Sequence, residues 1–241
     1  MVTVEDFKYV LTLWNGHKIP GLIERDIKVD LDSNKIIAIA GSRRSGKTYV
    51  MFQCINDLLK KGVKKDNILY INFENERLVG ITAINLDDLL IAHRELFNPN
   101  GVIYIFLDEI QIVENWDKWV RKIYDTGKYR VIVAGFSSEL LSSEIATSLA
   151  GRNLTYIVYL FSFKEYVDAK ALQIIKLQKY SIEMGAILKA MNDFLEFGSF
   201  PEITMTSNIS RKLEVLSSYF DAIFFKGIVR RYGIRRFKHL S

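Results

Sequence analysis

The sequence predicts an α/β fold with a five-stranded parallel sheet and a small, helical C-terminal lid. Three observations lead to this prediction. Short apolar runs alternate with segments in which apolar residues recur at helical spacing, a pattern typical of a parallel sheet covered on both faces. A glycine-rich loop joins the first apolar run to the helix that follows it. After residue 165 this alternation stops, and only helical patterns remain.

Each predicted strand is a short apolar run bounded by polar or turn-forming residues. Aliphatic and aromatic side chains, many of them β-branched, dominate the runs, as expected for strands buried on both faces. The third run ends in two adjacent carboxylates, Asp108 and Glu109. In chain order, the predicted strands are Lys35–Ala40, Asn67–Phe73, Val102–Leu107, Arg130–Ala134 and Leu154–Leu160.

The predicted helices carry apolar residues three and four positions apart. One of them must stop before Pro99, because the residue before a proline avoids the helical conformation. We predict an α/β nucleotide-binding domain with an N-terminal helix over residues 1–165, and a lid with a basic C-terminal helix over residues 166–241. The helices are Val4–Trp14, Thr48–Lys61, Leu86–Phe97, Trp116–Asp125, Ser138–Leu149, Ile182–Phe197 and Arg211–Arg231.

The loop after the first strand reads GSRRSGKT and fits the phosphate-binding pattern G-x-x-x-x-G-K-[ST]. Backbone N–H groups of such a loop point inward and cradle phosphate oxygens. Lys47 is expected to reach the β- and γ-phosphates of ATP, and the Thr48 hydroxyl to ligate Mg²⁺. Arg43 and Arg44 are expected to face outward. The predicted nucleotide-binding residues are Gly41, Ser42, Arg43, Arg44, Ser45, Gly46, Lys47, Thr48 and Tyr49.

Asp108 and Glu109 are the second predicted part of the site. Asp108 is expected to hold Mg²⁺, and Glu109 to orient and polarise the attacking water. The alternative is a pair of solvated carboxylates at a strand end. The spacing favours the site, because it leaves room for one strand and one helix after Lys47. Asn72 or Asn75, at the end of the second strand, could contact Glu109.

Further motifs follow in a fixed order. The strand that ends at Asp108 continues as DEIQ and leads into a helix that contains Trp116. With the G-x-R-R-x-G-K-T loop, these motifs resemble the AAA+-like P-loop ATPases of archaea and bacteria. Phe136 departs from the small polar residue that is usual there. The other runs that carry the resemblance are Ala134–Leu141, Leu149–Arg152, Leu160–Glu165, Phe194–Pro201 and Tyr219–Ile234.

The resemblance implies roles for three more residues. Ser137 would sense the γ-phosphate, or it is simply a helix N-cap. Arg152 would stabilise transition-state charge in its own subunit or in a neighbouring one, or it forms a surface ion pair. Pro201 would pack near the adenine, or it only breaks a helix. Members of the family typically continue into a winged-helix and a nuclease-like region, so the chain is expected to be truncated or naturally short.

Charge and composition limit the partners. Basic residues are in surplus from Asn208 onward, whereas residues 1–207 are close to neutral. This C-terminal surplus predicts a DNA or protein partner, or only a solvated helix face. The N-terminus lacks the pattern of a signal peptide and no apolar run is long enough to span a membrane, which favours a cytoplasmic protein. The single cysteine, Cys54, rules out an intrachain disulfide, and the three scattered histidines make a zinc site improbable.

These observations favour an Mg²⁺-dependent ATPase that couples ATP hydrolysis to a conformational change. Two alternatives remain at this point. One is an ATP-dependent switch with negligible turnover in the absence of a partner. The other is a nucleic-acid-binding protein that uses its basic C-terminus. An oligomer would be required if Arg152 acted on a neighbouring subunit.

Overall fold

Five apolar runs form the strands of one parallel sheet, which confirms the predicted α/β class. The computed structural model describes residues 2–136, 149, 151–172 and 182–223. The sheet order is β2-β3-β4-β1-β5, so β4 lies between β1 and β3. The strands are β1 Ile36–Gly41, β2 Ile68–Asn72, β3 Ile103–Asp108, β4 Tyr129–Phe136 and β5 Asn153–Val158.

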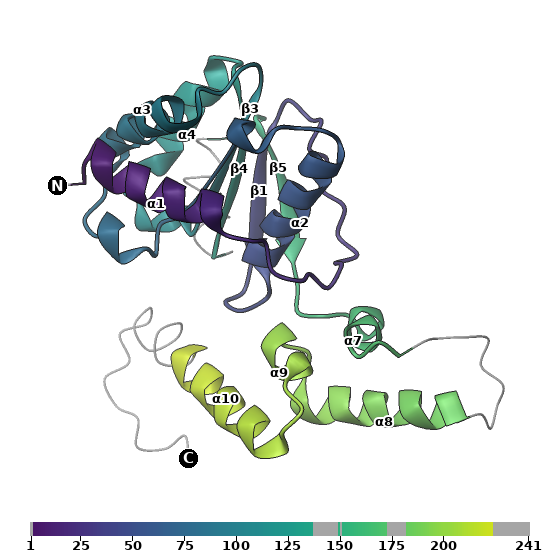
Figure 1. The fold of residues 1–241 in the computed structure, drawn as a ribbon. Coiled ribbons are helices and arrows are strands. Elements are labelled where there is room, and N and C mark those ends of the chain that lie inside the picture. Colours follow the sequence, from purple (N-terminus) through teal and green to yellow (C-terminus); the bar gives the residue numbers. More distant parts are fainter. Residues whose placement is uncertain (1, 137–148, 150, 173–181, 224–241) are drawn as a thin grey trace. The chain divides into compact units, whose positions relative to one another are not determined.

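Helices cover both faces of the sheet (Figure 1). Alternate side chains of each strand point to opposite faces, and β1 to β4 each contribute to two apolar clusters, whereas β5 contributes to the second only. One cluster contains side chains of α1 (Val4–Gly16), α3 (Leu86–Phe97) and α4 (Trp116–Asp125). The other cluster contains side chains of α2 (Lys47–Lys60), with Val50, Met51 and Ile55 almost fully buried. Burial on both faces explains why β1 to β4 read as continuous apolar runs, whereas β5 is partly exposed.

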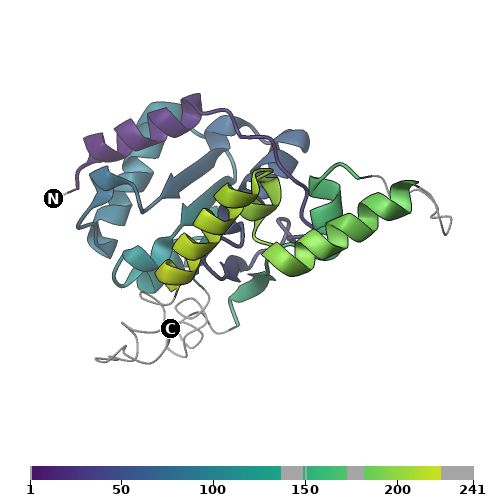
Figure 2. The same cartoon turned by 90° about the horizontal axis from the view of Figure 1, so that it is seen from below.

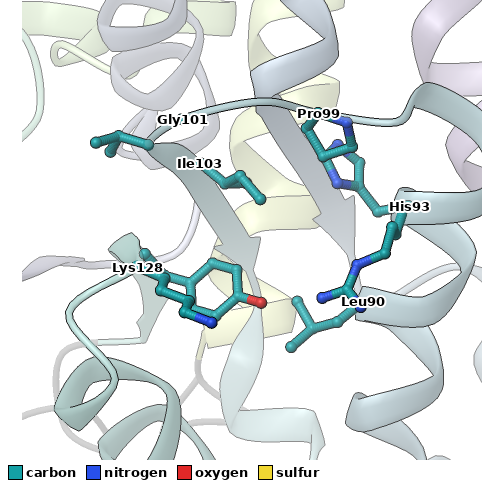
Figure 3. Close-up of a pocket in the computed structure, with 9 residues that line it drawn as sticks. Leu90, His93, Pro99, Gly101, Ile103 and Lys128 are labelled. Carbon is teal, nitrogen blue, oxygen red and sulfur yellow. The ribbon is translucent and has the colours of Figure 1, made fainter.

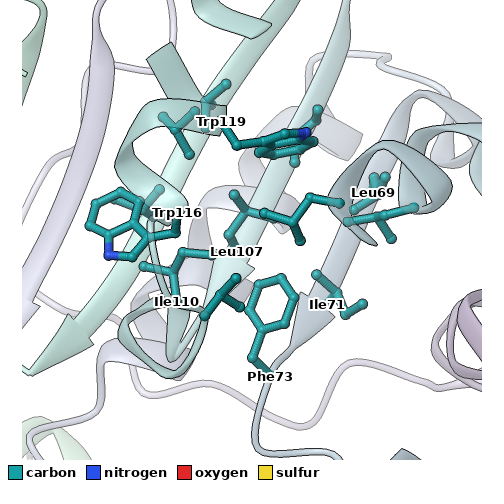
Figure 4. Close-up of a cluster of buried hydrophobic side chains, with 14 of the residues drawn as sticks. Leu69, Ile71, Phe73, Leu107, Ile110, Trp116 and Trp119 are labelled. Carbon is teal, nitrogen blue, oxygen red and sulfur yellow. The ribbon is translucent and has the colours of Figure 1, made fainter. Parts of the chain in front are cut away.

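The first cluster is rich in large side chains (Figure 4). Trp116 and Trp119 of α4 lie beside the side chains of β2 and β3, and each is 4% exposed. The indole N–H of Trp119 donates to Asp87 of α3 at 2.8 Å, so its polar group is satisfied. Cluster residues labelled in the figure are Leu69, Ile71, Phe73, Leu107, Ile110, Trp116 and Trp119.

Local end signals set the bounds of several helices. α1 begins after Thr3, whose side chain and backbone form a reciprocal capping box with Asp6. α3 ends at Phe97, and its C-cap Asn98 adopts φ 43° ahead of Pro99. The structure confirms the predicted bounds of α3 and α4. Short 3-10 helices occupy Lys65–Asn67, Glu76–Leu78, Ala83–Asn85 and Ile110–Ile112.

The chain divides into two compact units. The first contains Met1–Ser42 and Gly46–Tyr159, and the second contains Arg43–Ser45 and Leu160–Ser241. The division after the sheet therefore falls between Tyr159 and Leu160, whereas the sequence placed it at residue 165. The difference arises from α7 (Phe163–Ala169), which was not predicted. Phe163 and Tyr166 of this helix pack against Phe194, a residue of the second unit.

The second unit is helical. Besides α7 it contains α8 (Ile182–Phe197), α9 (Pro201–Met205) and α10 (Ile209–Asp221). In Figure 2, α8 and α10 approach each other beside the short α9. The bounds of α8 agree with the prediction, but the second predicted helix, Arg211–Arg231, is described only as far as α10 and residue 223. The core of this unit contains Phe197, Ile203, Val215 and Tyr219.

No helix in the described ranges is long and apolar enough to cross a membrane.

Candidate functional site

The phosphate loop connects β1 to α2 and has the backbone of an anion site. Arg44 and Gly46 both adopt positive φ, 62° and 96°. Gly46 is the N-cap of α2, and glycine adopts this conformation without the steric cost that a Cβ would add. Successive N–H groups in such a turn converge, and the positive end of a 14-residue helix dipole adds to them.

Lys47 is the first residue of α2, and its side chain is 5% exposed. Its Nζ donates to the carbonyl oxygen of Ser42 at 3.1 Å, so the side chain folds back over the loop. The same Nζ lies 3.9 Å from Oε1 of Glu109. The lysine of the first motif therefore lies beside the glutamate of the second.

Thr48 and Asp108 connect the two motifs directly. The Thr48 hydroxyl donates to Oδ2 of Asp108 at 2.7 Å. Asp108 ends β3 and is fully buried. β4 separates β3 from the strand that precedes the phosphate loop, so this bond reaches across the carboxyl end of an intervening strand.

Burial governs the chemistry of Asp108. It raises the pKa of the Asp108 carboxyl from 3.8 to about 6, because the charged form loses its hydration. The hydrogen bond from Thr48 opposes this rise, whereas the negative charge of Glu109 adds to it. A buried carboxylate and a hydroxyl at this distance are hard oxygen donors of the kind that Mg²⁺ accepts. The donor set therefore fits the predicted metal.

Tyr70 of β2 also contacts Asp108, a contact that the sequence did not predict. Its hydroxyl donates to Oδ2 at 3.0 Å. Trp14, near the end of α1, lies 4.4 Å from the Tyr70 ring between centroids, and Phe52 of α2 lies 5.3 Å from it. The register explains the contact, because residues 70 and 72 share a face of β2 and Asn72 pairs with Asp108, a pairing that the sequence alone does not reveal.

Glu109 follows β3 in the left-handed region, with φ 52° and ψ 40°. Its Oε2 accepts a hydrogen bond from the side-chain amide of Gln111. The expected partners make other contacts: Asn72 accepts the backbone N–H of Glu74, and Asn75 accepts that of Arg77. These two asparagines stabilise the turn after β2. The prediction that one of them contacts Glu109 is wrong, because the side chain that hydrogen-bonds the Glu109 carboxylate is that of Gln111.

The structure places the remaining candidates as follows. Ser137 comes directly after β4 but lies outside the described residues. Pro201 is the first residue of α9, so it starts a helix there, as its fixed φ allows. Arg44 groups with the second unit, where its guanidinium lies 3.9 Å from the centroid of the Tyr219 ring and 3.2 Å from Glu202.

Arg152 lies at the amino end of β5, and its backbone carbonyl accepts the N–H of Ile36. Ile36 begins β1, whereas the phosphate loop follows Gly41 at the other end of that strand. The Arg152 side chain pairs with Asp125 at 3.7 Å. This contact agrees with the alternative interpretation of Arg152 as a member of a surface ion pair. Because a six-residue strand separates Arg152 from its own loop, only a role toward a neighbouring subunit stays a prediction.

A pocket of about 360 Å³ opens at the amino ends of β3 and β4 (Figure 3). His93 lines it and is 2% exposed, and burial lowers the pKa of its imidazole to about 4. These amino ends lie opposite the carboxyl ends of the strands, where the phosphate loop is. It is lined by Leu90, His93, Pro99, Gly101, Ile103 and Lys128, among others.

Comparison with known sequences identifies the family. A family described as "AAA domain" matches residues 33–167, more than half of the chain. The chain belongs to this AAA domain family. With the loop geometry above, it is a nucleotide-binding protein of the P-loop ATPase type.

Two relatives are similar over most of the chain. An uncharacterized protein of Methanocaldococcus jannaschii, MJ1544, is 44% identical over 221 residues, which are 91% of this chain and 48% of the relative. An uncharacterized protein of Haemophilus influenzae is 30% identical over 204 residues, 85% of this chain and 48% of the relative. The AAA domain chain thus spans about half the length of these curated relatives.

Among solved structures, the chain is similar to AMPPCP-bound DnaA from Aquifex aeolicus. The TM-score is 0.41 at 16% identity, over 81% of this chain and 57% of that chain.

Proposed function

We propose that the chain is an Mg²⁺-dependent ATPase of the AAA+-like type, which couples ATP hydrolysis to a conformational change. The observation that carries the proposal is the 2.7 Å hydrogen bond between Thr48 and Asp108, reinforced by the 3.9 Å approach of Lys47 to Glu109. Two motifs far apart in the sequence thereby form one constellation of a cation, a hydroxyl and two carboxylates. Each member has a defined task in phosphoryl transfer.

Thr48 and Asp108 would hold Mg²⁺, since both present oxygen atoms to one point. When bound, Mg²⁺ would neutralise part of the charge on the phosphates. The positive charge would also favour the ionised form of Asp108, which burial alone disfavours. The loop N–H groups and Lys47 would hold the phosphate oxygens.

Glu109 would orient the attacking water and accept its proton. Its side chain is 19% exposed, so it remains open to solvent at the end of β3. The proposal keeps Ser137 as a γ-phosphate contact and Arg152 as a donor of charge to a neighbouring subunit. It keeps Pro201 as an adenine contact. Each of these three roles rests on the family resemblance.

The test is an ATPase assay with Mg²⁺ on the wild type, Glu109→Gln and Lys47→Ala. We expect Glu109→Gln to bind ATP and to lose about 10²–10⁴-fold in turnover, the contribution typical of a general base. We expect Lys47→Ala to lose nucleotide affinity. Matched controls are Glu114→Gln, an exposed residue near Glu109, and Lys60→Ala, exposed at the end of α2. Unchanged turnover in both site variants would refute the proposal.

The same assay separates the alternatives. Tight ATP binding with no turnover, in the presence of DNA, RNA and candidate protein partners, would favour a nucleotide-dependent switch. A DNA affinity that is independent of ATP would favour a nucleic-acid-binding protein.

A further inference from the structure

We propose that Gln111 is the positioning residue for Glu109, and that its amide fixes the orientation of the carboxylate that would accept a proton from the attacking water. The inference rests on the proposed ATPase function and concerns the same site. It begins from a hydrogen bond that neither the phosphate loop nor the Asp108–Glu109 pair requires: the Gln111 side-chain amide donates to Oε2 of Glu109.

The orientation of this amide is determined by its surroundings. Oε1 of Gln111 is buried and has no hydrogen-bond partner in the described part of the chain. The bond to Glu109 therefore decides which way the amide points. In the flipped orientation, its oxygen would face a carboxylate oxygen, and two acceptors cannot form a hydrogen bond.

The backbone brings the two side chains together. Glu109 adopts φ 52°, a conformation that is uncommon for residues other than glycine and that concentrates at functional sites. A 3-10 turn over Ile110–Ile112 follows at once, and the N–H of Ile112 donates to the carbonyl of Glu109 at 3.1 Å. Ile110, the first residue of this turn, and Val113, which follows it, are both fully buried. Because the turn is held in this way, the side chain of Gln111 lies within hydrogen-bond distance of the Glu109 carboxylate.

This arrangement divides the work between the two oxygens of Glu109. Gln111 contacts Oε2, and Lys47 lies 3.9 Å from Oε1. The terminal torsion of a glutamate side chain is broad, so a carboxylate without such a contact samples many orientations. The hydrogen bond from the Gln111 side-chain amide restricts this torsion. It leaves Oε1 of Glu109 directed toward Lys47, the residue that would hold the γ-phosphate. Restricting a catalytic group in this way acts on the rate, because the reactive geometry is present before the reaction begins.

Steady-state kinetics of Gln111→Ala test the inference. We expect kcat to fall about 10–100-fold, the range typical when a residue that orients a catalytic ligand is removed. The Kd for a non-hydrolysable ATP analogue should stay within about 2-fold of the wild type, because Gln111 supports the carboxylate and not the phosphate loop. Ile112→Ala is the matched control: it lies in the same turn, 45% exposed, and should leave kcat unchanged. A merely structural role would lower kcat and nucleotide affinity together.

A double-mutant cycle shows whether Gln111 acts through Glu109. In a Glu109→Gln background, Gln111→Ala should cause no further loss of turnover, because the group that it positions is already gone. Thermal unfolding supplies a readout that does not depend on turnover. Gln111→Glu should lower Tm by placing two carboxylates in contact, and Glu109→Gln with Gln111→Glu should restore it. Additive losses in both measurements would overturn the inference.

The outcomes separate the two proposals. Wild-type turnover together with an unchanged kcat in Gln111→Ala overturns the inference alone. A wild type that binds nucleotide but does not hydrolyse it, with Mg²⁺ and candidate partners present, overturns the proposed function and the inference with it.

Discussion

At the scale of single residues, the site is defined by polar groups in places where burial is costly. Asp108 accepts two hydroxyl donors, from Thr48 and Tyr70, on the same oxygen. These bonds reduce the cost of burying the carboxylate but do not remove it, because its pKa remains raised to about 6. A group held in this way favours function over the stability of the apo-protein.

A pH-dependent effect on stability follows. In the unfolded chain Asp108 titrates near 3.8, and in the folded chain near 6, so the folded state binds more protons between these values. Stability contributed by this group is therefore fully present below pH 3.8 and lost as pH rises to about 6. Without added Mg²⁺, Asp108→Asn should be more stable than the wild type at pH 7, by at most about 3 kcal/mol at about 1.4 kcal/mol per pKa unit.

Urea unfolding at pH 4, 5, 6 and 7 measures this difference. The advantage of Asp108→Asn should be small at pH 4, grow to pH 6 and stay constant above it. Asp87→Asn is a control carboxylate whose pKa is lowered, by its hydrogen bonds and its charge pairing with Lys122, so its substitution should destabilise instead. If the difference in unfolding free energy between Asp108→Asn and the wild type did not change with pH, the raised pKa of Asp108 would be contradicted.

At the scale of elements, α2 converts the loop into a site. Its two ends carry glycines with positive φ, Gly46 at 96° before the helix and Gly62 at 87° after it. The first belongs to the phosphate loop, whereas the second only connects α2 to the next strand. Comparing substitutions at Gly46 and Gly62 therefore distinguishes the effect of backbone strain on stability from the effect of the loop on nucleotide binding.

Both glycines are therefore matched sites for substitution by alanine. We expect Gly46→Ala and Gly62→Ala each to lower the free energy of unfolding by about 1–2 kcal/mol, because an L-residue is strained in the left-handed region. Only Gly46→Ala should weaken ATP binding, measured by calorimetry with Mg²⁺. Equal affinity in the two variants would show that the loop conformation does not hold the phosphates.

How far the sequence predicts these elements depends on how local their determinants are. α3 and α4 were predictable to the residue, because their apolar spacing lies within them and end signals such as Asn98 and Pro99 follow α3 directly. The seven-residue α7 was too short for its spacing to be recognised. The contact of Tyr70 with Asp108 depends on the pairing of β2 with β3, which no local pattern reveals.

At the scale of the whole molecule, each unit has a core of its own. The sheet unit buries two large apolar clusters, whereas the described residues of the helical unit form one small cluster around Phe197, Ile203, Val215 and Tyr219. The AAA domain match ends at residue 167, near the start of the helical unit. The sequence after α10 is rich in lysine and arginine, and packing in the two cores does not account for this positive charge.

That charge predicts a salt-dependent interaction with DNA. If four arginines there contact phosphates, replacing Arg230, Arg231, Arg235 and Arg236 by alanine should weaken binding and reduce the slope of log K against log salt by roughly 3 to 4. Fluorescence anisotropy with duplex DNA from 50 to 200 mM salt, approximately the range over which such contacts weaken, measures this. Replacing Lys60, Lys61, Lys64 and Lys65 by alanine removes the same charge from the sheet unit and should leave the slope unchanged. Equal effects of the two sets would indicate nonspecific attraction.

The position of β4 between β1 and β3 has a consequence for biosynthesis. The chain emerges from the ribosome in sequence order, so β1, α2, β2 and β3 are all made before β4, which ends at Phe136. Until β4 inserts, no strand joins β1 to β3 in the described sheet, so the backbone pairing that sets Thr48 beside Asp108 is incomplete, although both residues have already been synthesised. A nascent chain should therefore become able to retain nucleotide only after this last central strand has left the exit tunnel.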